Sequence, residues 1–514
     1  MNFHLLHYLR GPLLLILLIS MVQTIDAQSL NDSPEVAYEV FVQSYKDSNG
    51  DGIGDLRGLI SKLDYIQELG ATMIWLMPIH PSPSYHKYDV MDYYGIHQHY
   101  GTMADMDSLI VEMKKRKMKL ILDLVINHTS NQHPWFVASS SPDSNEFTNY
   151  YVWRNFEEVQ NEIEKKTTTF DSDNITQWHE SSTRPDRYYG FFSGRMPDLN
   201  FDNPAVRKEV YKIGKFWLDK GVDGFRLDAA KHIYPDDRLD DTRKFWKEFT
   251  TEMKKIKPGV KLFGEVWSDP QTVASLFPGL PSMFNFEVAS NITDCVQSRD
   301  PLKFISRYQS MDSIYKAAGV AYEDATLLSN HDMNRTRSTL EESIGQSKLA
   351  AAILLTLPGT PFIYYGEEIG MLGMKPDEYI REPFIWSDKM RKDSSWLKPK
   401  YSVPQKITPL DSQLVNEKSI YSFYKRWISF RKTYPALNKG SIEFVQTDYP
   451  NVLAFIRRYK GENIMVLHNL DEKPVEIKMT EPFTSLTKGP NQLDEHRLLV
   501  PKYGSGLLKL GPKE

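Results

Sequence analysis

Eight short apolar runs recur along the chain, and each of them ends in polar residues. The runs cover residues 36–45, 73–81, 119–128, 222–232, 260–267, 283–287, 325–332 and 361–368. Near-continuous Val, Ile, Leu and Phe is typical of strands that are buried on both faces, as the strands of a parallel sheet are. The repetition of such runs is the strongest constraint that this sequence places on its fold.

Helices with one apolar face are predicted between these runs. Apolar residues recur at i, i+3 or i+4 in three sets: Leu56, Leu59, Leu63 and Ile66; Met106, Leu109, Ile110 and Met113; Val206, Val210, Ile213 and Trp217. Alternating strands and helices with eight strand candidates predict an α/β fold, a (β/α)8 TIM barrel. A doubly wound open sheet is the alternative, but no G-x-G-x-x-G follows the first run.

Two stretches depart from the barrel pattern. The connection after "NHTS" (127–130) has roughly seventy residues, whereas ordinary βα loops have about 2–6. We therefore expect an inserted subdomain over residues 129–204, after the third strand, between barrel segments 28–128 and 205–438. From "SIEFVQ" onward the pattern becomes a strand-like alternation, which predicts a C-terminal antiparallel β-sandwich domain over residues 439–514.

The N-terminus has the layout of a secretory signal peptide. Arg10 precedes the apolar run "GPLLLILLISMV", and Ala27 offers a small residue for cleavage, so residues 1–27 are predicted to be removed. The run is short for a bilayer span of about 20 residues, although an uncleaved anchor is the alternative. We expect an exported protein, periplasmic or extracellular, with no membrane span in the mature chain. The formal net charge of −5 argues against a nucleic-acid partner.

The segment "DSNGDGIGD" (47–55) resembles the first nine positions of a calcium-binding loop. Its oxygen ligands would come from Asp47, Asn49, Asp51, the Ile53 carbonyl and Asp55. The twelfth position, where an EF-hand needs Glu, is Gly58, so a calcium sensor is rejected. We expect a structural calcium, with magnesium as the substitute ion. An Asx-rich turn without a metal is the alternative interpretation.

Polar and charged residues gather where the predicted strands end. Because these ends meet at one mouth of a barrel, the following side chains are expected to converge: Asp123, Asn127, His128, Arg226, Asp228, Glu265, His331 and Asp332. A single Asp at a strand end is usually a cap or turn residue. Several carboxylates together, without a redox cofactor motif or an apparent Ser-His-Asp set, favour glycoside hydrolysis.

Six polar-ended segments stand out along the chain: "DLVINH" (123–128), "MPDLN" (196–200), "GFRLDAAKH" (224–232), "GEVW" (264–267), "SNHD" (329–332) and "GTPFIYYGEEIG" (359–370). They resemble motifs of the α-amylase family of glycoside hydrolases, and they occur in the order of that family. The resemblance runs from about residue 34 to the end of the chain.

The resemblance implies a role for each matching residue. Asp228 would be the nucleophile, Glu265 the general acid and base, and Asp332 the carboxylate that stabilises the transition state. Arg226 would keep Asp228 ionised. Contacts with the sugar at the cleaved bond would come from Tyr88, His128 and His331. Retention of the anomeric configuration follows from these roles.

The specificity within the family is harder to predict. Lys231 and His232 resemble residues with which α-amylases contact glucose units beyond the cleaved bond, and Ala229 follows the nucleophile where exo-acting relatives often have Val. We therefore expect an α-amylase that cleaves α-1,4 bonds in starch, glycogen or maltooligosaccharides, acting as a monomer. An exo-α-glucosidase, an oligo-1,6-glucosidase and a maltodextrin transglycosylase or isomerase remain alternatives.

Two further expectations come from the same resemblance. Asn127, Asp198 and the His232 carbonyl match a calcium site between barrel and insert in many α-amylases, although the oligo-1,6-glucosidase and neopullulanase branch, which "DSNGDGIGD" and "MPDLN" resemble, often lacks it. Non-catalytic relatives that pair with amino-acid transporters lose the carboxylates, whereas Asp228, Glu265 and Asp332 are all present here.

Overall fold

The computed structural model describes residues 35–163, 177–387, 394–480, 482–487 and 491–511. The predicted signal segment 1–27 lies outside this part of the chain. Within the described ranges, none of the helices combines the length and the apolar character that a bilayer crossing requires.

Eight parallel strands form a closed barrel in the order β1-β11-β10-β9-β8-β7-β3-β2. Their bounds are β1 Ala37–Val40, β2 Met73–Leu76, β3 Lys119–Leu124, β7 Gly224–Leu227, β8 Lys261–Gly264, β9 Ser282–Phe284, β10 Glu323–Thr326 and β11 Thr360–Tyr364. Each of the eight apolar runs contributes residues to one strand, so the prediction of a TIM barrel is confirmed. The strands are shorter than the runs because the polar ends of the runs form the loops at the barrel mouth.

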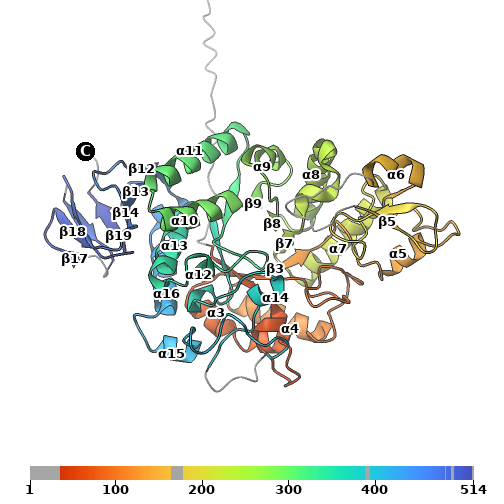
Figure 1. The fold of residues 1–514 in the computed structure, drawn as a ribbon, viewed down its shortest axis with the longest axis horizontal. Helices are drawn as coiled ribbons and strands as arrows, with labels where there is room; N and C mark the ends of the chain where they lie inside the picture. The colour runs from red at the N-terminus through yellow and green to blue at the C-terminus, as the bar shows by residue number, and fades with distance from the viewer. Residues whose placement is uncertain (1–34, 164–176, 388–393, 481, 488–490, 512–514) are drawn as a thin grey trace, which may run out of the picture.

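Helices surround the barrel on its outside (Figure 1). The larger ones are α4 Met103–Lys115, α7 Pro204–Lys220, α8 Leu239–Ile256, α10 Phe286–Ser298, α11 Pro301–Ala317, α13 Ile344–Thr356 and α16 Ile420–Thr433. The predicted apolar faces are buried: Val206, Ile213 and Trp217 of α7 have at most 1% of their surface exposed.

The first amphipathic stretch is not one helix, as its spacing predicts, but two: α2 Leu56–Ile60 and α3 Leu63–Leu69. The Ser61 hydroxyl donates to the Gly58 carbonyl at 2.6 Å, which is the carbonyl that the Lys62 amide would use in a continuous helix. The Lys62 amide bonds Leu59 instead. Such a bond from a serine side chain competes with helical pairing and causes the break.

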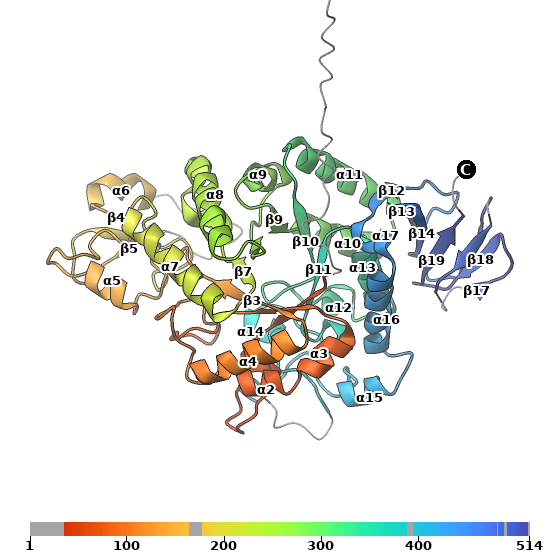
Figure 2. The ribbon, with the colours of Figure 1, turned by 180° about the vertical axis from the view of Figure 1, so that it is seen from behind.

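The long connection between β3 and α7 contains elements of its own. These are α5 Pro134–Ser139, β4 Trp153–Arg154, α6 Phe156–Ile163, β5 Trp178–Glu180 and β6 Arg187–Tyr189, with a sheet in the order β4-β6-β5. Phe136 stacks on Trp153, with 5.8 Å between ring centroids, and also packs against Tyr188. The connection is thus a small subdomain, and it lies at the opposite end of the molecule from the C-terminal strands (Figures 1 and 2).

The C-terminal region consists of antiparallel strands, as predicted. One sheet has the order β12-β13-β14-β19-β16 and the other β15-β18-β17. The bounds are β12 Ser441–Phe444, β13 Val452–Tyr459, β14 Glu462–Asn469, β15 Val475–Lys478, β16 Phe483–Ser485, β17 Asn491–Gln492, β18 Arg497–Val500 and β19 Ser505–Leu510. Side chains of both sheets, among them Leu467 and Leu498, form one apolar cluster. The arrangement is therefore a β-sandwich.

Candidate active site

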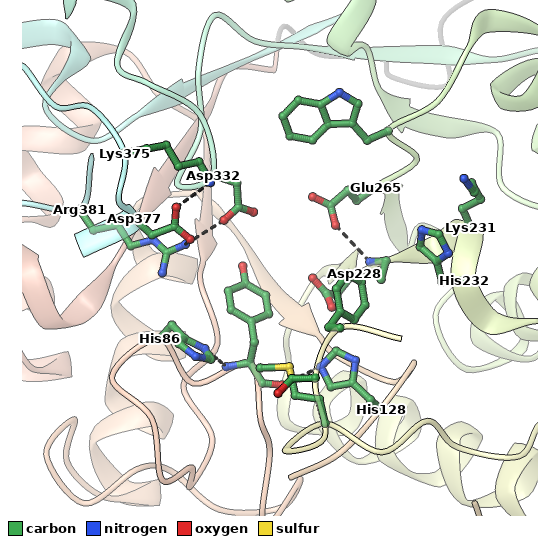
Figure 3. Close-up of a pocket in the computed structure, with 16 residues that line it drawn as sticks. His86, His128, Asp228, Lys231, His232, Glu265, Asp332, Lys375, Asp377 and Arg381 are labelled. Carbon is green, nitrogen blue, oxygen red and sulfur yellow. Dashed lines mark hydrogen bonds and ion pairs between the residues drawn. The ribbon is translucent and has the colours of Figure 1, made fainter. Parts of the chain in front are cut away.

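A cavity of about 470 Å³ opens where the barrel strands end. Seven of the residues expected at the site line it: Tyr88, His128, Asp228, Lys231, His232, Glu265 and Asp332 (Figure 3). The other expected residues are not part of its lining and are buried, with at most 2% of their surface exposed: Asp123, Asn127, Arg226 and His331. Residues from five parts of the sequence thus meet at one place.

Arg226 on β7 binds three carboxylates at once. Its Nη1 lies 2.6 Å from Asp228 Oδ1 and 2.9 Å from Asp123 Oδ1. Its Nη2 lies 2.7 Å from Glu265 Oε1. The sequence suggests only the pair with Asp228, so the structure adds Glu265 and Asp123 as partners. The guanidinium fixes the positions of two acids that face the cavity.

The electrostatics of the three cavity acids differ. Burial raises the pKa of Glu265 and of Asp228, and the positive charge of Arg226 opposes this rise in both. Burial also acts to raise the pKa of Asp332, but His331 and then Arg381 outweigh it, so the pKa of Asp332 is lowered well below its usual range. Asp332 is therefore the acid that stays ionised, whereas burial favours the protonated forms of Glu265 and Asp228 and the charge of Arg226 opposes this in both.

Arg381 is a site residue that the sequence did not indicate. It follows the short helix α14 Asp377–Ile380 and lines the cavity, and its Nη2 lies 2.8 Å from Asp332 Oδ1. The same nitrogen contacts Asp377 at 3.1 Å, and Nη1 donates to the Tyr85 hydroxyl at 3.0 Å. No strand end or motif marks this position, so nothing in the sequence analysis pointed to it.

Tyr88 and His128 both line the cavity. The Tyr88 ring stacks on His331, with 5.4 Å between centroids and 13° between ring planes. Its hydroxyl donates to Asp123 Oδ2 at 3.0 Å. His128 Nε2 lies 3.2 Å from the Tyr88 carbonyl oxygen, and burial lowers the pKa of His128 to about 4. His128 is therefore a neutral ring at neutral pH.

Lys231 and His232 follow Asp228 on the 3-10 helix Ala230–Ile233. Ala229 before them has φ 46°, in the left-handed region, which turns the chain sharply after the strand. The His232 ring stacks on Phe191 at 4.0 Å between centroids, and Lys231 Nζ lies 3.4 Å from Asp236. Both side chains border the cavity on the Glu265 side (Figure 3).

Trp267, the last residue of the "GEVW" motif, also lines the cavity. The residue is 43% exposed. It stacks flat on Phe286, with 4.5 Å between centroids and 6° between planes. A rigid, exposed aromatic ring two residues after Glu265 provides a surface on which a sugar ring can stack.

The predicted calcium loop precedes α2. Asp47 accepts hydrogen bonds from the amides of Asn49, Gly50 and Gly52 at 2.7–2.9 Å, and Asp55 accepts from the Gly58 amide at 2.7 Å. In the described ranges, no group of three or more His, Cys, Asp or Glu side chains is arranged as a metal cluster. The donors, which are carboxylates, an amide oxygen and a carbonyl, nevertheless suit a hard cation by their chemistry. Asp47 Oδ1 accepts two of these amides, whereas Asp47 Oδ2 accepts only the Gly52 amide and still offers a second lone pair.

The second candidate metal site lies where the insert returns to the barrel. The Asn127 side-chain oxygen is buried and has no hydrogen-bond partner in the described part of the chain. Asp198 is 4% exposed, and burial raises its pKa well above the usual value. An unpartnered amide oxygen beside a buried carboxylate fits a cation.

Comparison with known proteins places the chain in a family. Residues 39–440 match "Alpha amylase, catalytic domain", and residues 442–488 match "Maltogenic Amylase, C-terminal domain". The chain is 47% identical to Alpha-amylase 3 of Dictyoglomus thermophilum over 484 residues, which cover 92% of this chain and 93% of that protein. It is 33% identical to a 4-alpha-glucanotransferase of Thermotoga neapolitana over 461 residues, 88% of this chain and 99% of that protein.

A solved structure agrees with these matches. The crystal structure of an alpha-amylase from H. orenii superimposes with a TM-score of 0.87 at 40% identity, covering 94% of this chain and 100% of that one. The family match spans most of the chain, and the eight-stranded barrel with its acidic cavity is in place. The protein therefore belongs to the α-amylase family of glycoside hydrolases.

Proposed function

We propose that the protein is an α-amylase that cleaves α-1,4-glucosidic bonds of starch, glycogen or maltooligosaccharides with retention of configuration. The observation that supports this most is the single guanidinium of Arg226, which binds Asp228 at 2.6 Å and Glu265 at 2.7 Å. Two carboxylates on one guanidinium favour the spacing of about 5–5.5 Å that is typical of retaining enzymes, rather than the wider gap of inverting ones.

In the first step, a carboxylate oxygen of Asp228 attacks the anomeric carbon and the bond to the leaving sugar breaks. Glu265 gives its proton to the leaving oxygen. The raised pKa of Glu265, caused by burial and opposed by Arg226, supports this role because the acid must be protonated near neutral pH.

In the second step, water attacks the anomeric carbon of the glycosyl-enzyme and gives its proton to Glu265. The bond to Asp228 then breaks and the carboxylate is regenerated. Asp332, held ionised by His331 and Arg381, stabilises the positive charge that develops on the sugar in both transition states. Tyr88 and His128 contact the sugar at the cleaved bond.

The side of the cavity next to Glu265 would bind the glucose units beyond the cleaved bond. Lys231, His232 and Trp267 border the cavity there, and such contacts favour an endo-acting α-amylase. An exo-α-glucosidase, an oligo-1,6-glucosidase or a transglycosylase is the alternative. The similarity to a 4-alpha-glucanotransferase supports the transglycosylase in particular.

Calcium and export complete the proposal. Asp47, Asn49, Asp51, Ile53 and Asp55 would hold a structural calcium ahead of α2, and Asn127 with Asp198 and the His232 carbonyl would hold a second one. The ions would fix loops and take no part in the reaction. The sequence of residues 1–27 supports export to the periplasm or the medium, where polymeric glucan is met.

Chromatographic product profiling on starch, pullulan, maltotriose, maltose and isomaltose tests the proposal, with Asp228→Asn as the inactive control. A mixture of short maltooligosaccharides from starch is the expected result. Glucose released mainly from isomaltose would contradict it in favour of an oligo-1,6-glucosidase. Longer products from maltotriose would identify a transglycosylase, and trehalose formed from maltose an isomerase.

A further inference from the structure

Glu39 is a buried carboxylate directly beneath the cavity to which neither the sequence motifs nor the mechanism assigns a role. It is the third residue of β1, and 1% of its surface is exposed. Its Oε1 lies 2.6 Å from Nδ1 of His331, which follows β10. In the described part of the chain, His331 is the one basic side chain within 4 Å of this carboxylate. Burial raises the pKa of Glu39 and the neighbouring His331 opposes this rise, so the carboxylate needs this partner to remain charged.

The other ring nitrogen of His331 also faces acceptors. Nε2 lies 2.9 Å from Asp332 Oδ2 and 2.5 Å from the Tyr88 hydroxyl oxygen. The Asp332 carboxylate is ionised and has no proton to donate, so it can only accept from Nε2. Nε2 therefore carries a proton.

Both ring nitrogens thus point at acceptors, Glu39 on one side and Asp332 on the other. A neutral imidazole has a single N–H and could satisfy one of them, whereas an imidazolium has two. Burial alone would lower the pKa of His331, but Asp332 and Glu39 outweigh it and raise the pKa to about 10. The remaining charged or titratable groups around the ring are Tyr88, Asp123, Arg226, Asp228 and Arg381.

We propose that Glu39 is a positioning residue for the reaction: it holds His331 as an imidazolium whose Nε2–H is aimed at Asp332. The carboxylate acts through His331 and does not touch the sugar. Its charge allows Asp332 to stay ionised and fixed in orientation next to the reacting ring. The expected kinetic effect rests on the proposed hydrolase function, whereas the charge state of His331 does not.

The first test is NMR of the full-length protein carrying ¹⁵N-labelled histidine, with the His331 signals assigned by their loss in His331→Gln. We expect both ring nitrogens of His331 to be protonated at pH 8 in the wild type and one of them to be deprotonated in Glu39→Gln. A neutral His331 at pH 8 in the wild type, paired with a protonated Glu39, would overturn the proposal. This arm needs no substrate, so it gives a result even if the protein hydrolyses no glucan.

The second test is kinetic. In Glu39→Gln, kcat on a maltooligosaccharide should fall about tenfold at pH 8 and less at pH 5.5, with KM within about twofold. The alkaline limb of the pH profile should move down by about one unit. Glu39→Asp, which keeps the charge, should recover part of the loss. The matched control is Glu323→Gln, a buried acid on β10 that binds Thr360, and it should leave the profile unchanged.

An unchanged pH profile in a folded Glu39→Gln variant would contradict the inference. A lower melting temperature together with an unchanged pH profile of kcat would show that Glu39 contributes only to folding. This result would also contradict the inference. If Glu39→Gln does not fold, the wild-type NMR measurement still decides the charge state of His331.

Discussion

Arg381 Nη2 lies 2.8 Å from Asp332 Oδ1, while His331 Nε2 lies 2.9 Å from the other oxygen of the same carboxylate. Asp332 is therefore held at both oxygens by positive groups from two different segments of the chain. Arg381 itself is 3% exposed. This double contact accounts for the lowered pKa of Asp332 and fixes the direction in which its charge points.

Replacement of Arg381 by Gln should lower kcat/KM about a hundredfold, because a charged hydrogen bond to the stabilising carboxylate is lost. Kinetics on a soluble maltooligosaccharide check this. Arg116→Gln is the matched control, since Arg116 pairs with Glu112 and Asp64 at the surface, remote from the cavity. Equal activities of the two variants would show that Arg381 has no part in the reaction.

Replacement of Trp267 should weaken the binding of long substrates and hardly change the stability of the protein. The residue is 43% exposed and its indole rests on Phe286, so Trp267→Ala removes a stacking surface without opening the core. We expect KM for maltoheptaose to rise about five- to tenfold and KM for a substrate with a small aryl leaving group to change less. The melting temperature should stay within about 2 °C. Trp267→Tyr should restore most of the binding, and equal KM changes for both substrates would argue against a glucose-binding surface.

Removal of calcium should lower stability and leave the catalytic residues intact. Chelation with EDTA is expected to lower the melting temperature, and added calcium should restore it, since a ligand of the folded state stabilises it by mass action. In Asp47→Asn the fall in melting temperature on chelation should be smaller, because only the second proposed site, at Asn127 and Asp198, would still bind calcium. Calorimetric titration of calcium into the stripped protein measures the stoichiometry, and no binding at all would leave the loop as a metal-free turn.

Asp324 should make stability depend on pH. It is buried on β10, accepts from the Asn285 side chain at 3.0 Å, and burial raises its pKa to about 7. Because this folded-state pKa exceeds the unfolded one, the contribution of Asp324 to stability is lost as pH rises from about 4 to about 7. Asp324→Asn should therefore stabilise the protein by about 1–3 kcal/mol at pH 8 and by much less at pH 4. Denaturant unfolding at both pH values measures this, and a pH-independent difference would refute it.

The barrel could be predicted from the sequence because its strands are buried on both faces. The eight apolar runs, separated by helical stretches, match the eight buried strands of the closed barrel, β1 to β3 and β7 to β11. The single long first helix was predicted wrongly, since apolar spacing does not register the Ser61 hydroxyl bond to Gly58. A side-chain hydrogen bond that competes with the backbone bonds of a helix is visible only in the structure.

The site residues that could be predicted are those at strand ends or in motifs. Arg381 lies in a loop, and Glu39 lies inside an apolar run where a charged residue has no evident purpose. Their partners Asp332 and His331 are separated from them by long stretches of chain and come near only when the barrel closes. The spacing of residues along the sequence does not reveal such contacts.

The central claim is that Asp228 forms a covalent bond with the sugar. Incubation with a 5-fluoro-α-glycosyl fluoride, followed by intact mass measurement and peptide mapping, tests it most directly, with Glu265→Gln used to slow turnover further. The account predicts one added glycosyl unit, located on the peptide that contains Asp228 and missing in Asp228→Asn. A label on another residue, or hydrolysis that inverts the anomeric configuration without any label, would contradict the account.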